Sequence, residues 1–210
     1  MKNMLIAGNW KMNTNVFESQ KLVEYILGFV KTNATLKSKV LVCPPFTSVY
    51  AIGQMIENTK LLLGAQNCYY EEKGAFTGEI SIPMLEYCGV SYIIIGHSER
   101  RSYFKEEDEI INKKLLAILE HNLTPILCIG ETLDERNQGR TFDILINQLD
   151  KNLAGITGDT IERVVIAYEP VWAIGTGISA TREQVQEAHD FLRHFLVEKF
   201  GEKANRVYLL

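Results

Sequence analysis

Two kinds of apolar segment alternate along this 210-residue chain, and their alternation constrains the fold more than any other feature. The short kind is an almost continuous apolar run of four or five residues. Strands buried on both faces have this pattern, because a strand with one face in water alternates apolar and polar side chains. Seven such runs predict strands at 4–7, 40–43, 61–64, 92–95, 125–129, 164–168 and 207–210.

The longer kind repeats apolar residues at the three- and four-residue spacing of a helix. Asn15 and Glu18 have the spacing of a helix N-cap and its partner, and Thr181 with Gln184 reads as a capping box. The acidic run 106–108 suits a positive helix N-terminus, and Gly201 marks a helix end. The predicted apolar stripes are Leu22, Ile26, Phe29 and Val30; Ile111, Leu115, Ile118 and Leu119; Phe142, Leu145, Leu149 and Leu153; Val185, Ala188, Leu192, Phe195 and Leu196.

Strands that alternate with helices across short connections predict parallel strands joined by crossover helices, which is an α/β fold. The chain has no Pro/Gly/Ser-rich linker and no low-complexity tract, so we expect one domain over 1–210. Two architectures remain open at this point, an open doubly wound sheet and a closed barrel. Both place their chemistry at the C-terminal ends of the strands.

Composition excludes several classes of protein. The chain has 22 Lys and Arg against 26 Asp and Glu, a net charge of −4, which argues against nucleic-acid binding through a broad basic face. No run approaches the ~18 apolar residues of a membrane span. Cys43, Cys68, Cys88 and Cys128 form no CxxC pair and no dense disulfide framework, so we expect a reducing, cytoplasmic compartment. The four histidines show no metal-ligand spacing.

Polar residues follow several strand ends where a structural turn would not need them. Lys11 follows the first strand, His97 and Glu99 the fourth, Glu131 the fifth and Glu169 the sixth. Each has an ordinary explanation, such as a surface charge or, for His97, the cap of a short helix. In a parallel barrel, however, all these ends meet at one face, which favours a shared site.

Two familiar motifs fit poorly. The segment 96–100 resembles the GxSxG nucleophile elbow, but Arg100 stands where the crowded turn requires glycine, which disfavours Ser98 as a nucleophile. The segment 175–180 matches GxGxxG/A, but six residues separate it from the strand end and no acidic residue follows at the next strand. A dinucleotide-binding function is therefore disfavoured.

The segment after Glu169 has the composition of a lid. It is predominantly apolar, with Pro170 at one end and Gly175 and Gly177 at the other. Its closure would exclude water beside the carboxylate and make that group a stronger base. With a hydrogen-bond donor at His97 and a cation at residue 11, this set suits proton abstraction next to a carbonyl, without a metal or cofactor.

Six segments together resemble the triosephosphate isomerase family in order and spacing. The resemblance runs from the start of the chain to the seventh predicted strand. The segments are AGNWKMN (7–13), GAQN (64–67), GAFTGEIS (74–81), IIGHSERR (94–101), CIGE (128–131) and AYEPVWAIGTG (167–177).

The resemblance implies interconversion of dihydroxyacetone phosphate and glyceraldehyde 3-phosphate through an enediolate, in glycolysis and gluconeogenesis. It implies that Glu169 is the base and that His97 polarises the carbonyl as a neutral imidazole. It also implies that Asn9 and Lys11 bind the substrate, Lys11 through the charge of its ammonium group. Glu99 matches the acidic partner expected near Lys11.

The resemblance also implies a (β/α)8 TIM barrel, a phosphate contact from the backbone N–H of Gly175, and a homodimer formed through the loop around Thr77. Family members have about 250 residues. This chain stops at Leu210, so we expect a barrel that lacks its eighth strand and helix and belongs to a longer protein. The alternatives are a truncated relative that acts as a binding protein and another sugar-phosphate isomerase.

Overall fold

The computed structural model describes residues 4–33, 37–177 and 179–210. The chain divides into two compact units, which are described separately. The first unit holds residues up to 94 together with 120–124, and the second holds residues 95–119 and 125–210. The prediction of a single domain over 1–210 stays a prediction.

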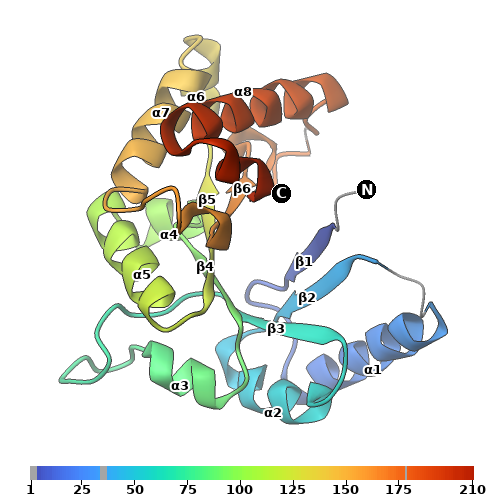
Figure 1. The fold of residues 1–210 in the computed structure, drawn as a ribbon. Helices are drawn as coiled ribbons and strands as arrows, with labels where there is room; N and C mark the ends of the chain where they lie inside the picture. Colours follow the sequence, from blue (N-terminus) through green and yellow to red (C-terminus); the bar gives the residue numbers. More distant parts are fainter. Residues whose placement is uncertain (1–3, 34–36, 178) are drawn as a thin grey trace. The chain divides into compact units, whose positions relative to one another are not determined.

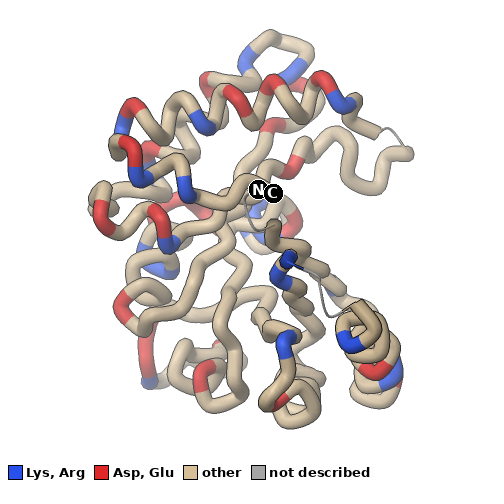
Figure 2. Tube along the Cα trace, turned by 45° about the vertical axis from the view of Figure 1, so that its right-hand side comes forward, with Lys and Arg blue, Asp and Glu red and all other residues tan. Residues whose placement is uncertain are grey.

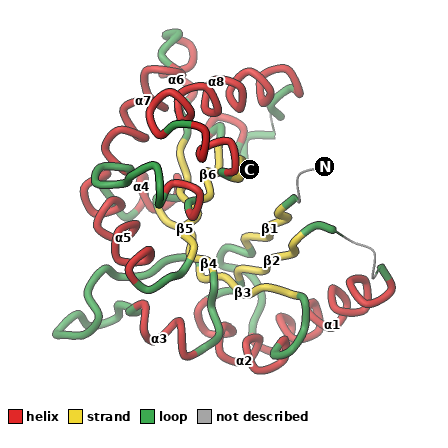
Figure 3. Tube along the Cα trace, viewed as in Figure 1, coloured by secondary structure: helices red, strands yellow, loops and turns green. Residues whose placement is uncertain are grey.

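The seven predicted strands are present, and their bounds agree with the prediction within two residues. Strands β1 to β6 are labelled in Figures 1 and 3. Their order in the sheet is the order of the chain, and the β1–β2, β2–β3, β3–β4, β5–β6 and β6–β7 pairs are parallel. A doubly wound sheet reverses its strand order at a switch point, so this succession excludes that alternative and fits a barrel. The strands are β1 (Leu5–Asn9), β2 (Lys39–Cys43), β3 (Leu61–Ala65), β4 (Tyr92–Ile95), β5 (Thr124–Ile129), β6 (Val165–Tyr168) and β7 (Tyr208–Leu209).

Helices of the first unit pack on β1, β2 and β3 (Figure 1). The predicted capping box of α1 is confirmed, because Asn15 and Glu18 exchange hydrogen bonds with each other's backbone N–H groups. The predicted apolar stripe of α1 is wrong, since Leu22 and Phe29 are exposed in the described chain. Contact with α2 sets the buried face instead, where the Ser19 hydroxyl donates to the Ser48 hydroxyl at 3.0 Å. These helices are α1 (Val16–Thr32), α2 (Phe46–Ile56) and α3 (Ile82–Tyr87).

The second unit carries the other predicted helices. The stripes of α5 and α7 are confirmed except at Phe142, which is half-buried, and the α8 stripe is buried at Ala188, Leu192 and Leu196. The Thr181–Gln184 capping box is confirmed, and α8 ends at Gly201 with φ 76°. The α-helices are α4 (Ser98–Tyr103), α5 (Asp108–Glu120), α6 (Leu133–Asn137), α7 (Thr141–Asn152) and α8 (Arg182–Phe200). The 3-10 helices are η1 (Ile161–Arg163), η2 (Val171–Ala173) and η3 (Glu202–Arg206).

The acidic run at 106–108 is only partly a helix N-terminus. Asp108 begins α5, but Glu106 is buried before it. Its carboxylate accepts a hydrogen bond from the Lys114 ammonium at 2.8 Å and another from the Arg100 guanidinium. Glu106 therefore belongs to a buried ion-pair cluster rather than to a solvated helix end.

Charged residues of both signs are interspersed along the helices of each unit (Figure 2). Among the helices of the described ranges, none combines the length and apolar content of a membrane span.

Candidate active site

The ends of β4 and β6 bring two predicted site residues, His97 and Glu169, together within the second unit. His97 Nε2 lies 3.3 Å from Glu169 Oε2, and the Ser98 hydroxyl donates a hydrogen bond to the same oxygen at 2.8 Å. The side chains of His97 and Glu169 are only 12% and 11% exposed. The structure thus places the predicted imidazole and carboxylate within reach of one small molecule.

His97 is also the N-cap of α4. The role of a helix cap and the role of a hydrogen-bond donor in the site are therefore compatible. Its Nδ1 accepts a hydrogen bond from the backbone N–H of Glu99 at 3.3 Å. The Glu99 carboxylate is farther from Nδ1, at 3.5 Å, and is a weaker partner for it. Because Nδ1 accepts, a neutral imidazole carries its proton on Nε2, the nitrogen that faces Glu169. That N–H is placed to donate to a carbonyl oxygen.

Glu169 has two oxygens in different environments. Oε2 receives the hydrogen bond from Ser98, whereas Oε1 is buried and has no hydrogen-bond partner among the described residues. A buried polar atom without a partner is costly and usually marks a functional site. The carboxylate is acceptor-only when ionised, so Oε1 is suited to take a proton from a bound molecule.

The first unit holds the other predicted polar residues at the end of β1. Lys11 adopts the left-handed region with φ 53°, and its N–H donates to Asn9 Oδ1 at 3.0 Å. The Gln66 amide donates to the carbonyls of Lys11 and Cys43, each at 2.9 Å. A non-glycine residue held at positive φ is strained, and such strain concentrates at functional sites. That Lys11 and Asn9 meet the same substrate as His97 stays a prediction.

The predicted lid is anchored through a buried carboxylate. Trp172 is buried in η2, and its indole N–H donates to Glu131 Oε1 at 2.9 Å. Glu131 is fully buried and also accepts from the Tyr168 hydroxyl at 3.1 Å and from Arg136 at 3.0 Å. The Arg136 guanidinium stacks over the Trp172 ring at 4.7 Å.

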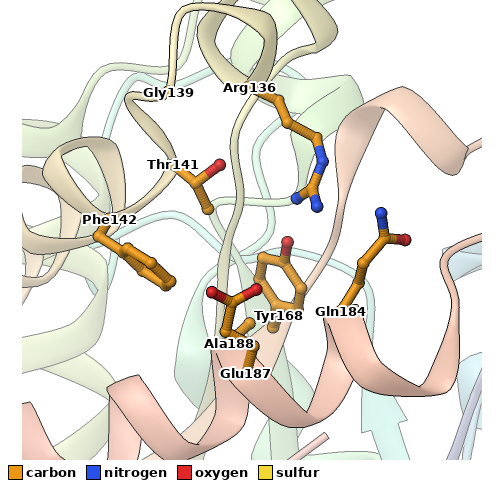
Figure 4. Close-up of a pocket in the computed structure, with 8 residues that line it drawn as sticks. All are labelled: Arg136, Gly139, Thr141, Phe142, Tyr168, Gln184, Glu187 and Ala188. Carbon is orange, nitrogen blue, oxygen red and sulfur yellow. The ribbon is translucent and has the colours of Figure 1, made fainter.

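Burial and the charge of Glu131 both raise the pKa of Tyr168, so its hydroxyl stays protonated and remains a donor. A pocket of about 250 Å³ adjoins this anchor (Figure 4). The residues that line this pocket do not include His97 or Glu169, so the pocket and the His97–Glu169 pair are separate features of the second unit. Its lining is Arg136, Gly139, Thr141, Phe142, Tyr168, Gln184, Glu187 and Ala188.

Glycine is required by backbone conformation at the far end of the lid. Gly175 has φ 70° and Gly177 has φ 76°, a region that side chains disfavour. The backbone at Gly175 also has open space around it, since a Cβ there would meet no atom within 4 Å. An N–H presented this way suits close approach of a ligand. The GxGxxG-like segment extends through residue 178, which lies outside the described residues.

No group of three or more His, Cys, Asp or Glu side chains in the described ranges is arranged to hold a metal ion. One of the histidines, His121, instead lies beside two carboxylates. Its Nδ1 is 2.9 Å from Glu86, and its Nε2 is 3.5 Å from Glu72. Cys128 is a buried thiol at the end of β5 that forms no disulfide with another described residue, and its assignment to packing stays a prediction.

Sequence reasoning missed three contributors. Glu131 was noted only as a polar residue after a strand, yet it holds Trp172. The sequence pattern places Tyr168 only at the end of a strand and Gln66 only within the segment GAQN. Periodicity cannot reveal contacts of this kind, because each joins residues far apart in the sequence. For the contact of Glu131 with Trp172, the available signal in the sequence was a carboxylate that follows a predicted strand.

Trp172→Phe should loosen the lid, because it removes the indole donor to the buried Glu131 carboxylate while keeping an aromatic ring. A hydrogen bond to a charged group contributes about 1.5–3 kcal/mol, so the anchored fraction of the lid should shift by about tenfold or more. A looser lid exposes the enediolate, the intermediate that the family resemblance implies, to water before it is converted to product. We expect more inorganic phosphate released per substrate isomerised, measured by a phosphate assay beside an isomerase assay. An unchanged ratio would show that the indole hydrogen bond does not hold the lid.

Comparisons with known proteins agree with the resemblance. The family profile described as triosephosphate isomerase matches residues 4–210. A protein named triosephosphate isomerase from Caldanaerobacter subterraneus subsp. tengcongensis is 49% identical over 208 residues, covering 99% of this chain and 83% of the relative. One of the same name from Clostridium perfringens is 50% identical over 203 residues, covering 97% and 81%.

A comparison with solved structures also indicates the fold of the triosephosphate isomerase family. The crystal structure of triosephosphate isomerase from Bartonella henselae matches with a TM-score of 0.87 and 36% identity, covering 99% of this chain and 81% of that one. The α/β TIM-barrel fold expected from the resemblance is therefore confirmed. The chain belongs to the triosephosphate isomerase family.

Proposed function

We infer that this protein is a triosephosphate isomerase that interconverts dihydroxyacetone phosphate and D-glyceraldehyde 3-phosphate. The observation that carries this conclusion is the pair formed by His97 and Glu169, a hydrogen-bond donor and a carboxylate 3.3 Å apart whose side chains are only slightly exposed. Membership of the family supports a triose phosphate as the substrate, and the His97–Glu169 pair supports proton transfer as the reaction. An aldose–ketose exchange moves one proton between adjacent carbons, which needs a base on one side and a donor at the carbonyl oxygen.

The reaction follows from these two groups. The Glu169 carboxylate takes a proton from carbon 1 of dihydroxyacetone phosphate, and the electron pair of that C–H bond forms the enediolate. The imidazole N–H of His97 stabilises the negative charge that develops on the oxygen of carbon 2. The proton of the carbon 1 hydroxyl then passes to the oxygen of carbon 2 through the His97 imidazole, which donates from Nε2 and takes that proton in exchange. The carboxylic acid at Glu169 returns a proton to carbon 2, and the electron pair on the carbon 1 oxygen forms the aldehyde. A bound substrate must displace the present contacts of Glu169 Oε2 with Ser98 and His97, because it needs the same donors.

The other predicted site residues have supporting roles in this proposal. Lys11 supplies a positive charge for the phosphate and the enediolate, and Asn9 holds the backbone that carries it. Glu99, which matches the family's acidic residue in the motif IIGHSERR, fixes the tautomer of His97 through its backbone N–H. The N–H of Gly175 contacts the phosphate. None of these steps requires a metal or cofactor.

Substrate size separates this function from that of another sugar-phosphate isomerase. We expect the purified protein to isomerise dihydroxyacetone phosphate with a far higher kcat/KM than fructose 6-phosphate in coupled assays. Similar or faster turnover of the larger ketose would favour the other sugar-phosphate isomerase. No turnover of either compound by folded protein would favour the noncatalytic binding protein.

We also propose a homodimer formed through the loop around Thr77. This loop is exposed from residue 71 to residue 79. The first unit also exposes large apolar side chains, which in a soluble assembly need a covering partner. Sedimentation analysis should find twice the chain mass, and a monomer at micromolar concentration would contradict the proposal. These exposed side chains include Phe76 in the loop itself and Met12, Phe46, Tyr50, Met84 and Tyr87 elsewhere in the unit.

The cysteines support a cytoplasmic location. Cys43, Cys68, Cys88 and Cys128 form no disulfide with one another, and burial raises the pKa of the Cys43 thiol to about 12. Free thiols are typical of proteins in reducing compartments. We propose the cytoplasm on this basis.

A further inference from the structure

We propose that Gln148 is a positioning residue for the base Glu169 and that it acts through the backbone of Gly130. The inference rests on the proposed function, in which the carboxylate of Glu169 moves the proton. Gln148 lies on α7, outside every motif that pointed to the site. Its side chain is half-buried and is directed at the turn that follows β5.

The Gln148 amide fixes both backbone groups of one residue. Its Oε1 accepts a hydrogen bond from the Gly130 N–H at 2.9 Å, and its Nε2 donates to the Gly130 carbonyl at 3.1 Å. Two hydrogen bonds from one planar amide define the orientation of this turn as well as its position. Glutamine is the side chain that offers a donor and an acceptor at this reach.

The fixed turn lies directly against the backbone of the base. A Cβ placed on Gly130 would come within 1.7 Å of the Glu169 carbonyl oxygen and 2.7 Å of its carbonyl carbon. The Glu169 N–H also donates to the carbonyl of Ile129, the preceding residue of β5, at 2.8 Å. The backbone of Glu169 therefore touches the segment that Gln148 holds, and a shift of Gly130 must move it.

Further hydrogen bonds connect Gln148 with Gly96, the residue before His97. Asn152 donates to the Gln148 carbonyl at 2.5 Å and to Asp108 at 2.8 Å. Asp108 accepts from the Arg101 guanidinium at 2.6 Å, and Arg101 donates to the carbonyl of Gly96 at 2.7 Å. Gly96 directly precedes the imidazole of the proposed pair. One hydrogen-bonded chain thus links the turn before the imidazole with the turn that supports the base.

Gln148 is not a catalytic residue in this proposal, because its side chain hydrogen-bonds the backbone of Gly130 and does not touch the reacting atoms. Its effect must therefore appear as misplacement of the base. A misplacement of about 1 Å can lower the rate of a proton transfer by about 100-fold. Substrate binding through the phosphate should change little.

The test is Gln148→Met, which keeps the length of the side chain and removes both hydrogen bonds to Gly130. We expect kcat to fall by about 10- to 100-fold, with KM changed by less than about threefold. The matched control is Asn147→Ala, the exposed neighbour on α7, which should keep the wild-type kcat. Circular dichroism and thermal unfolding verify that each variant is folded.

The primary isotope effect separates positioning from simple damage. With dihydroxyacetone phosphate deuterated at carbon 1, the isotope effect on kcat should be larger in Gln148→Met than in the wild type, because proton transfer becomes slower relative to the other steps. A variant that is merely less folded would lose kcat without a change in the isotope effect. Either that result, or a wild-type kcat in the folded variant, overturns the proposal.

Gln148→Glu provides a second route if the methionine variant fails to fold. Its carboxylate keeps the acceptor for the Gly130 N–H but has no donor for the Gly130 carbonyl, so kcat should again fall with an increased isotope effect. Wild-type values in this variant would also overturn the proposal. A wild-type protein without triose-phosphate isomerase activity would instead contradict the proposed function itself.

Discussion

Glu169→Gln is expected to lower kcat for dihydroxyacetone phosphate by about 10²- to 10⁴-fold, the usual contribution of a positioned general base. The amide has nearly the size and shape of the carboxylate, so it fits the same buried site. It can still accept the hydrogen bond that Ser98 donates to Oε2. It cannot take the proton, however, because an amide is not basic near neutral pH.

The measurement compares steady-state kinetics in both directions with the free energy of unfolding from denaturant titration. We expect the stability to remain close to that of the wild type, since the amide also relieves the buried, unpaired Oε1 of its charge. Glu183→Gln, an exposed position in the first turn of α8, is the matched control and should keep full activity. A Glu169→Gln variant with a kcat near that of the wild type would remove Glu169 from the role of base.

Lys114→Met is expected to cause a large loss of stability, about 3–5 kcal/mol, because it breaks a buried ion pair and leaves a buried carboxylate behind. Lys114 is 3% exposed and Glu106 is 8% exposed, and their charged atoms are 2.8 Å apart. Arg100 still pairs with Glu106 in the variant, but its own side chain is 29% exposed. It compensates only part of the missing charge.

Two further variants make this result specific. Lys113→Met, the exposed neighbour on α5, should change the stability by less than about 0.5 kcal/mol. The double variant Glu106→Leu with Lys114→Met should recover much of the loss, because an apolar pair removes the unpaired buried charge. If Lys114→Met alone left the free energy of unfolding unchanged, the pair would have no stabilising role.

The same cluster predicts a dependence of stability on pH. Burial opposes ionisation of Glu106, but the hydrogen bonds and charges of Lys114 and Arg100 outweigh it and hold its pKa below the usual value. A carboxyl group with a lowered folded-state pKa stabilises the fold above its unfolded pKa of about 4.3. This contribution is lost as the pH falls through the folded-state pKa. The stability of the wild type should therefore decline more steeply below about pH 4 than that of Lys114→Met.

The strands could be predicted from the sequence because their signal is local. Strands buried on both faces, such as β4 at Tyr92–Ile95, consist of a continuous apolar run that needs no partner to be recognised. Helix ends were equally readable where a cap and its partner lie three residues apart, as at Asn15 and Thr181. The buried face of α1 was misjudged because Leu22 and Val23 are both apolar, and only the packing partner decides which one is buried.

The candidate site was predictable only in part. His97 and Glu169 were identified because both follow strand ends, and parallel strands bring such ends together. Other contacts join residues that are between 18 and 55 positions apart in the sequence. They are the hydrogen bonds of Glu131 with Trp172, of Gln148 with Gly130, and of Gln66 with the carbonyls of Lys11 and Cys43. Such contacts depend on the direction of each side chain, which no spacing rule supplies. Glu106 shows the same limit, since its partner Lys114 follows it by eight residues across a turn.

The central claim is that a carboxylate at position 169 removes and returns a proton. Isomerisation of dihydroxyacetone phosphate in D2O, followed by NMR of the glyceraldehyde 3-phosphate, tests it most directly. Because a proton held by Glu169 can exchange with the solvent before it is returned, part of the product should carry deuterium at carbon 2. The Glu169→Gln variant should lose this labelling together with its activity. A Glu169→Gln variant that still isomerised the substrate and still placed deuterium at carbon 2 would show that another group moves the proton and would contradict the account.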